Sequence, residues 1–118
     1  MHLATKQERR QYERYAVSQD LYLIFRPDFQ KIGRLRDISK GGVCFDYTNL
    51  GGGKTPKNVE IDIFSAKREL HLTRIYCRVV YDLPIEPQST FKRISLRRCG
   101  LEFLTPSEQQ SLKLATLM

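Results

Sequence analysis

The order of apolar and polar residues along the chain is dominated by short segments in which the two kinds alternate. The clearest of these segments is Asn58–Phe64. There, Val59, Ile61 and Ile63 fall on one side of an extended backbone, and acidic residues fall on the other side. Such alternation is typical of an antiparallel strand with one buried face. The pattern predicts a protein that is built mainly of β-strands.

Six segments follow this rule, and turn residues such as proline, glycine and aspartate separate them. The predicted strands are Leu21–Arg26, Lys31–Ile38, Val43–Tyr47, Asn58–Phe64, Arg68–Asp82 and Phe91–Leu104. In the later half of the fifth strand, the alternation predicts one shared face for Ile75, Cys77, Val79 and Tyr81.

The last predicted strand contains a change of phase. Ile94 and Leu96 occupy even positions, whereas Leu101 and Phe103 occupy odd ones. A shift of one residue turns side chains to the opposite face unless the strand absorbs an extra residue. Glycine suits such a position. We therefore expect a β-bulge or a sharp bend within Arg97–Gly100.

The C-terminal residues predict a short helix. Thr105 and Glu108 form a Thr-x-x-Glu capping box, with Pro106 at the first helical position. The expected apolar stripe consists of Leu112, Leu114, Ala115, Leu117 and Met118. Six strands followed by one helix predict a mainly β fold, a six-stranded antiparallel β-barrel with the C-terminal α-helix packed on one opening.

The length of 118 residues predicts a single domain with a real hydrophobic core. We expect residues 1–16 to form a flexible N-terminal segment, residues 17–104 the barrel and residues 105–118 the helix. No apolar run approaches the roughly 20 residues of a membrane span. The charged N-terminus is not followed by the apolar stretch of a secretory signal.

Charge and cysteine content narrow the functional classes. A net charge of +7 favours an anionic partner such as a nucleic acid, a nucleotide or a lipid surface, and composition alone does not distinguish this from a soluble protein that is simply basic. Cys44, Cys77 and Cys99 are odd in number and widely spaced, so they predict neither a disulfide framework nor a metal site. We expect small buried side chains in a reducing compartment, which indicates a cytoplasmic location.

The glycine-rich stretch Gly51–Thr55 resembles a phosphate-binding loop only in part. The Walker pattern requires a glycine at the position of Thr48, and a helix would have to start where Pro56 stands. Catalysis has equally little support, because His2 lies at the terminus and His71 has no ligand or acid at a suitable spacing. The sequence predicts neither an enzyme nor a metal site.

Three arginines precede the first long strand: Arg9, Arg10 and Arg14. The guanidinium group is a planar fork of donors that grips phosphate oxygens and stacks on purines. A basic segment with this spacing is commonly a solvated tail, so it predicts no ligand without a second element.

The second element is the turn sequence Asp37-Ile38-Ser39-Lys40-Gly41-Gly42. Asp and Ser favour turns because they cap backbone amides, and glycine permits a positive φ. A carboxylate such as Asp37 also accepts hydrogen bonds from N1–H and the exocyclic amine of guanine, a pair that adenine lacks. Ser39 is a candidate donor to a phosphate or base, and Gly42 allows a ligand to approach the backbone.

Together these elements resemble the signature of the PilZ domain family, an RxxxR motif followed by (D/N)xSxxG. Arg10 and Arg14 fit the first motif, and Asp37, Ser39 and Gly42 fit the second. The resemblance covers nearly the whole chain. The resemblance implies a split-barrel receptor for the bacterial second messenger cyclic di-GMP, without cofactor. Arg10 and Arg14 would clamp phosphates and guanine edges, Asp37 and Ser39 would read a guanine, and Gly42 would shape the turn.

The resemblance also gives Arg9 a role. In the family, the residue before the first motif arginine affects whether one ligand or an intercalated pair is bound, and an arginine there favours a ligand dimer by stacking. Ligand would order the segment Met1–Arg14 and present a new surface to an unidentified protein partner. Family members regulate motility, biofilm polysaccharide, pili or transcription.

Two alternatives remain open on the sequence. One is a small basic nucleic-acid-binding barrel, which the net charge and the aromatic residues near the N-terminus favour. The other is a PilZ protein-interaction module that binds no ligand, which predicts no thermal shift with cyclic di-GMP.

Overall fold

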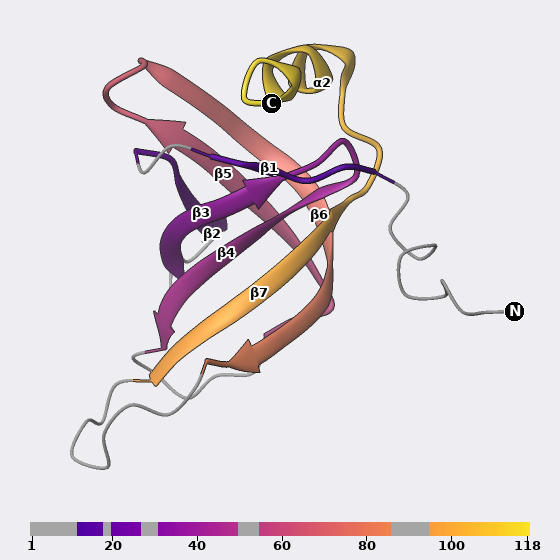
Figure 1. Cartoon of the computed structure of the whole chain (residues 1–118). Helices are drawn as coiled ribbons and strands as arrows, with labels where there is room; N and C mark the ends of the chain where they lie inside the picture. Colours follow the sequence, from indigo (N-terminus) through magenta and orange to yellow (C-terminus); the bar gives the residue numbers. More distant parts are fainter. Residues whose placement is uncertain (1–11, 18–19, 27–30, 50–54, 86–94) are drawn as a thin grey trace, which may run out of the picture.

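The computed structural model describes residues 12–17, 20–26, 31–49, 55–85 and 95–118. These residues form strands and one helix (Figure 1). The elements are β1 (Tyr15–Ala16), β2 (Tyr22–Arg26), β3 (Ile32–Ile38), β4 (Gly42–Asn49), β5 (Asn58–Ser65), β6 (Leu70–Pro84), β7 (Ser95–Phe103) and α2 (Glu108–Ala115).

The strands are all antiparallel and close into a barrel. The order around the barrel is β3-β2-β5-β6-β7-β4, and pairing of β4 with β3 closes the ring. The predicted six-stranded antiparallel barrel with a C-terminal helix is therefore confirmed. The short β1 was not predicted; it extends the sheet by pairing Tyr15 with Ile38 and Ala16 with Asp37.

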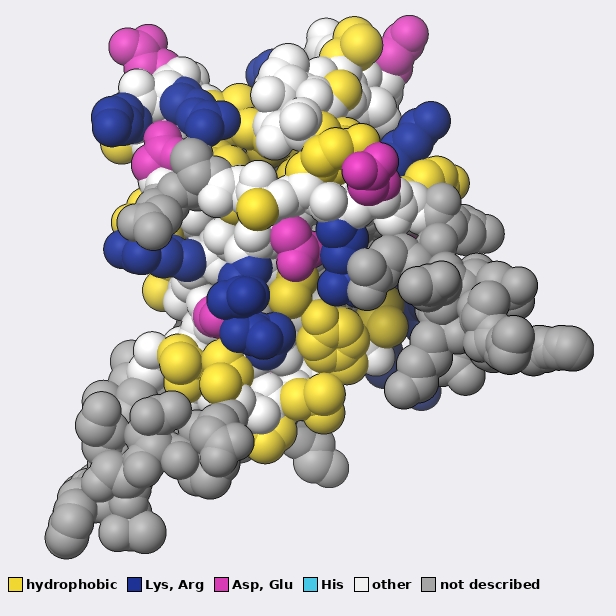
Figure 2. All heavy atoms as spheres, in the orientation of Figure 1, with side chains coloured by type: hydrophobic (Ala, Val, Ile, Leu, Met, Phe, Trp, Pro, Cys, Tyr) yellow, Lys and Arg dark blue, Asp and Glu magenta, His cyan; other side chains and the backbone are white. Residues whose placement is uncertain are grey.

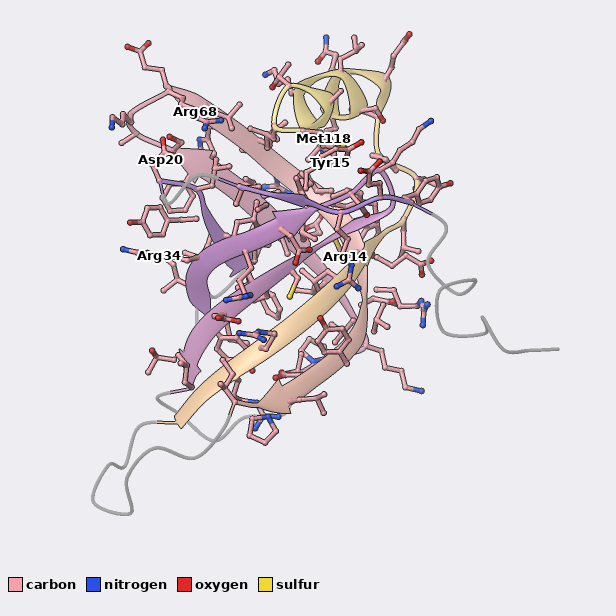
Figure 3. The ribbon with its side chains drawn as sticks, in the orientation of Figure 1. Arg14, Tyr15, Asp20, Arg34, Arg68 and Met118 are labelled. Carbon is pink, nitrogen blue, oxygen red and sulfur yellow. The ribbon has the colours of Figure 1, made fainter. Side chains whose placement is uncertain are left out.

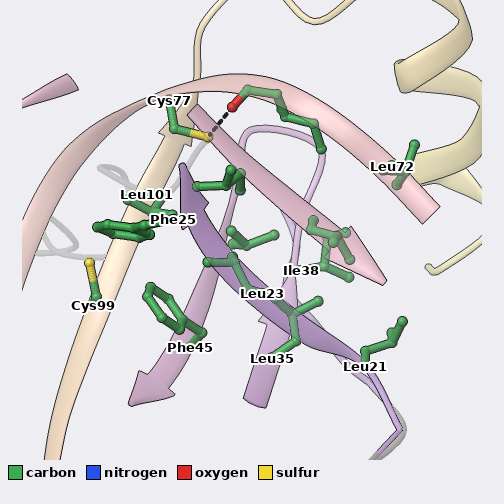
Figure 4. Packing of buried hydrophobic residues seen from close by; sticks show 14 of the residues in the cluster. Leu21, Leu23, Phe25, Leu35, Ile38, Phe45, Leu72, Cys77, Cys99 and Leu101 are labelled. Atoms are coloured by element: carbon green, nitrogen blue, oxygen red, sulfur yellow. Dashed lines mark hydrogen bonds between the residues drawn. The ribbon is translucent and has the colours of Figure 1, made fainter. Parts of the chain in front are cut away.

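The barrel interior is filled by the apolar positions of the alternating pattern (Figure 4). Leu23, Ile61 and Phe45 come from three different strands, and each is completely buried. Burial of such a side chain contributes roughly 1.5–3 kcal/mol. The three cysteines are buried, as predicted, and burial raises the pKa of Cys77 to about 12, so its thiol stays protonated.

One residue on the polar side of β5 departs from the pattern. Asp62 is only 3% exposed, because β6 places two residues, Thr73 and Arg74, opposite it in a β-bulge. The N–H of Arg74 donates to Oδ1 of Asp62 at 3.0 Å, and Nε of Arg26 donates to the same oxygen at 2.8 Å. Burial opposes ionisation, but these bonds, with the contact of His71, lower the pKa of Asp62 below its ordinary value.

A second register shift lies in the ladder between β6 and β7, and its extra residue is not in the strand where it was predicted. β7 pairs with β4 without interruption, so the bulge expected within Arg97–Gly100 is wrong. The shift lies in the neighbouring strand β6, where Val80 is the extra residue between Val79 and Tyr81. Consequently Tyr81 leaves the core face that it was predicted to share with Val79. Leu96 simply faces outward, with 39% of its surface exposed.

The helix α2 begins later than predicted. Its N-cap is Ser107, whose Oγ accepts from the N–H of Gln110 at 3.1 Å while the Gln110 side chain accepts from the N–H of Ser107 at 2.9 Å. The capping box is therefore Ser-x-x-Gln, and the predicted box of Thr105 and Glu108 is wrong. Gln110 fits because its amide also donates to the carbonyl of Thr73 at 2.8 Å and ties α2 to β6.

Only part of the expected apolar stripe of α2 is buried. Leu114 and Leu117 join the core, whereas Leu112 is 65% exposed and Met118 is 39% exposed. The stripe is narrower than predicted because a helix of 8 residues, about two turns, covers the barrel along a single line of side chains.

Candidate ligand-binding site

A cleft of about 580 Å³ lies on the outer wall of the barrel, within the size range of ligand pockets. The chain before β1, the turn between β3 and β4, and the strands β4, β6 and β7 form its walls. Its lining residues are Tyr12, Arg14, Asp37, Ser39, Gly41, Gly42, Val43, Cys44, Val80, Tyr81, Gly100, Leu101 and Glu102.

The pairing of β1 with β3 brings an arginine to this cleft. Because Tyr15 pairs with Ile38, the preceding Arg14 is held beside the turn that follows β3. Figure 3 shows the Arg14 side chain extending from this segment over the wall that contains β7. Within the described ranges, its guanidinium group forms no ion pair or hydrogen bond, so its donors are available to an anion.

The turn between β3 and β4 is built around Ser39. Its Oγ accepts hydrogen bonds from the N–H groups of Gly41 at 3.1 Å and Gly42 at 3.2 Å. Its own N–H donates to the carbonyl of Gly42 at 2.8 Å. These bonds use the acceptor capacity of the hydroxyl and leave a weak donor contact of 3.4 Å to the Gly42 carbonyl. The serine therefore shapes the turn and keeps a proton that can rotate toward a ligand.

In the observed arrangement, both glycines of the turn make contacts too close for a side chain. A Cβ at Gly42 would lie 2.0 Å from the carbonyl oxygen of Leu101, so β4 and β7 approach closely only with glycine there. A Cβ at Gly41 would lie 2.8 Å from the ring of Tyr12, which covers the turn. No described glycine uses the positive φ that glycine permits, so the close contacts are the reason for glycine here.

Asp37 lies on the opposite side of the turn from the glycines. It is half-buried, pairs with Cys44 across the β3–β4 ladder and lines the cleft. Its carboxylate has no hydrogen-bond or ion-pair partner among the residues that the structure describes. Two groups of opposite charge, Arg14 and Asp37, thus border one cleft without being neutralised by the described protein.

The floor of the cleft was not predicted from the sequence. The ring of Tyr81 covers Gly100, where a Cβ would come within 2.3 Å of it. Its hydroxyl lies 3.3 Å from Sγ of Cys44. Burial raises the pKa of Tyr81 to about 12 and also raises the pKa of Cys44, so both groups are neutral near pH 7. The bulge at Val80, which alternation cannot reveal, brings Tyr81 to this face.

The surroundings of the cleft are basic. Figure 2 shows Lys and Arg side chains gathered over β4 and β7, with a few acidic side chains among them. Arg98 and Arg36 both donate to the carboxylate of Asp46, at 2.8 and 3.3 Å, so this cluster keeps a net positive charge. Such a field attracts an anionic ligand to the cleft.

The structure brings four of the six predicted site residues together: Arg14, Asp37, Ser39 and Gly42 all line the cleft. The other two, Arg9 and Arg10, lie outside the described residues. Over the described ranges, no group of His, Cys, Asp and Glu side chains is arranged to hold a metal ion. No helix in those ranges has the length and apolar character needed to cross a membrane.

Comparison with known proteins adds independent information. The family model of the PilZ domain matches residues 8–118. No curated protein matches the sequence significantly. Among solved structures, the fold is similar to the PilZ domain with c-di-GMP of YcgR from Escherichia coli, with a TM-score of 0.68 and 15% identity over 91% of this chain and 86% of that chain.

A second similar structure is MrkH, described as a c-di-GMP-dependence transcription regulatory factor. The TM-score is 0.61 and the identity 16%, over 91% of this chain and 48% of that chain, so this chain spans about half of MrkH. At these identities the structural likeness shows a shared fold. Because the family model covers nearly the whole chain, the chain belongs to the PilZ domain family, and Arg14 of the first motif lines one cleft with the residues of the second motif.

Proposed function

We propose that this domain is a receptor for cyclic di-GMP that acts by binding and not by catalysis. The observation that carries the proposal is that Arg14 and Asp37 line the same cleft, each without a partner in the described part of the chain. An arginine fork suits a phosphate, and a carboxylate suits the donor edge of guanine. A cyclic dinucleotide of guanine offers both chemistries.

The proposed roles follow the two motifs. Arg10 and Arg14 clamp phosphates and guanine edges, and Asp37 accepts hydrogen bonds from a guanine. Ser39 donates a hydrogen bond from its hydroxyl to the ligand, while Gly42 keeps the wall of the cleft free of a side chain. Arg9 stacks on a second ligand and favours an intercalated pair.

The described part of the N-terminal segment supports a coupling mechanism. β1 is anchored to the barrel by only two paired residues, and Tyr12 touches the turn at Gly41. We propose that ligand bound by Arg14 ties residues 1–14 to the barrel, and that the ordered segment contacts a protein partner in the cytoplasm. Ordering costs about 1–2 kcal/mol per residue, so several charge-assisted bonds must offset it.

Calorimetry with cyclic di-GMP and cyclic di-AMP tests the binding proposal. The expected result is saturable binding of cyclic di-GMP and much weaker binding of cyclic di-AMP, because adenine lacks the donor pair that Asp37 accepts. Equal binding of the two ligands, or binding of neither, contradicts the proposal. The titration also gives the number of ligands, and two per chain would support the role of Arg9.

Hydrogen exchange tests the coupling mechanism separately. Ligand at saturation is expected to slow exchange in the segment that precedes β2. A control segment is β5, on the wall that does not line the cleft. Unchanged exchange before β2 at full occupancy would remove the coupling mechanism and leave the binding proposal intact.

The nucleic-acid alternative loses part of its support in the structure. A base-stacking surface requires exposed aromatic rings beside a basic groove, but Phe25 is buried and Tyr22 is half-buried against Phe64, with ring centroids 5.8 Å apart. Tyr12 and Tyr15 are 42% and 37% exposed, but the ring of Tyr12 lies against the turn at Gly41. Salt-dependent oligonucleotide binding that cyclic di-GMP does not compete away would revive that alternative.

A further inference from the structure

The cleft contains a second carboxylate that the motif residues do not explain. Glu102 lies on β7 directly opposite Gly42 of β4 and lines the same cleft as Asp37. Two acidic side chains are an unexpected lining for a site proposed to hold two phosphates, since like charges repel. Glu102 therefore needs both a neutralising partner and a reason to be there.

The neutralising partner is Arg78 of β6. Its Nε and Nη2 approach the same oxygen of Glu102, Oε1, at 2.8 and 2.7 Å. In the described ranges, the other oxygen, Oε2, has no hydrogen-bond partner. About half of the Glu102 side chain is exposed, 48%, so this oxygen is open to a ligand. The arginine holds the carboxylate in place and offsets its charge, yet leaves acceptor capacity free.

We propose that Glu102 reads the second guanine of the bound cyclic di-GMP. This inference rests on the proposed function. The ligand has two guanines, and each presents N1–H and an exocyclic amine that a carboxylate accepts together. With Asp37 reading one base, Glu102 is the other carboxylate of the described cleft that is available to the second. The site then selects for guanine at both ends of the ligand.

The test uses a hybrid cyclic dinucleotide that contains one guanine and one adenine. Wild-type protein is expected to bind cyclic di-GMP more tightly than the hybrid. Glu102→Ala is expected to reduce the ratio of the two affinities by about tenfold, because neither guanine nor adenine is then paired at this position. Glu102→Gln is expected to favour the hybrid further, because a carboxamide pairs its donor and acceptor with those of adenine.

Glu69→Gln is the matched control, because this exposed glutamate lies in the turn between β5 and β6 and does not line the cleft. It should leave the affinity ratio unchanged. If wild-type protein binds cyclic di-GMP but Glu102→Ala keeps the wild-type ratio, Glu102 is only a surface ion pair with Arg78 and the inference is overturned. If wild-type protein binds neither ligand, the proposed function fails instead.

Discussion

Two regions of the barrel wall each place an aspartate near arginines and beside a register shift. Only one of the two carboxylates has hydrogen-bond partners in the described chain. On the β5–β6 wall, Asp62 is 3% exposed and receives hydrogen bonds from Arg26 and the backbone of Arg74. On the β3–β4 wall, Asp37 follows a register shift in which Arg36 is the extra residue, and it is half-buried and has no partner in the described chain. The first carboxylate completes the fold, whereas the second remains available.

A third aspartate supports this distinction. Asp82 accepts hydrogen bonds from the hydroxyls of Tyr47 and Thr55 and from Nε of Arg97. Despite its burial, these bonds lower its pKa below the ordinary value. Carboxylates that serve the structure of this domain are thus surrounded by donors. An aspartate on a cleft without such donors is a candidate for ligand binding.

The largest effect is expected from removing the satisfied carboxylate. Asp62→Ala should lower the free energy of unfolding by about 3 kcal/mol, because Arg26 and the Arg74 N–H lose a shared acceptor in a buried bulge. Asp37→Ala should change it by less than about 0.5 kcal/mol, since it breaks no bond of the fold. Urea denaturation of both variants measures the difference. Equal destabilisation would contradict the comparison.

The next effect concerns ligand affinity, which a change of Asp37 is expected to reduce more than a change of Asp62. Asp37→Ala should weaken binding of cyclic di-GMP by about tenfold, or about 1.4 kcal/mol, and reduce the preference over cyclic di-AMP. The conservative variant Asp62→Asn, measured at a temperature where it is folded, should bind as wild type does. Calorimetry distinguishes the two, and a loss of affinity in Asp62→Asn alone would argue against our assignment of Asp37.

The smallest effect is a pH dependence. The native pKa of Asp62 is lowered, so this carboxylate stabilises the fold above the pKa of an unfolded aspartate. That contribution should disappear as the pH falls below about 4 toward the native pKa. Denaturation midpoints of wild type and Asp62→Asn should therefore converge in acid. A gap that stays constant from pH 6 to about pH 3 would show that the ionised carboxylate contributes nothing.

Alternation of apolar residues was sufficient to predict the six barrel strands, because one face of each is buried. It failed at the two positions where β6 has one residue more than the strand with which it pairs. The extra residue Val80 turns Tyr81 out of the core, and the bulge at Thr73 and Arg74 buries Asp62. A single strand read by itself carries no information about its partner's register, so neither bulge could be located.

The candidate site was predicted only in part, because some of its residues meet through the pairing of distant strands. The motif residues Asp37, Ser39 and Gly42 are close in sequence, and the turn that joins them is local. The contact of Tyr12 with Gly41 and the position of Glu102 depend on pairing between distant strands. The contact between Gly42 and Leu101 could not be predicted either, because a close approach between strands leaves no mark in the local sequence.

The most direct test of the central claim is calorimetry of cyclic di-GMP with wild type, Arg14→Ala and Arg34→Ala. Arg34 is an exposed arginine of β3 that does not line the cleft and has no ion-pair partner in the described ranges, so its variant removes the same charge elsewhere. We predict that Arg14→Ala loses at least about tenfold in affinity and that Arg34→Ala stays near wild type. Equal affinity of the two variants would contradict the account.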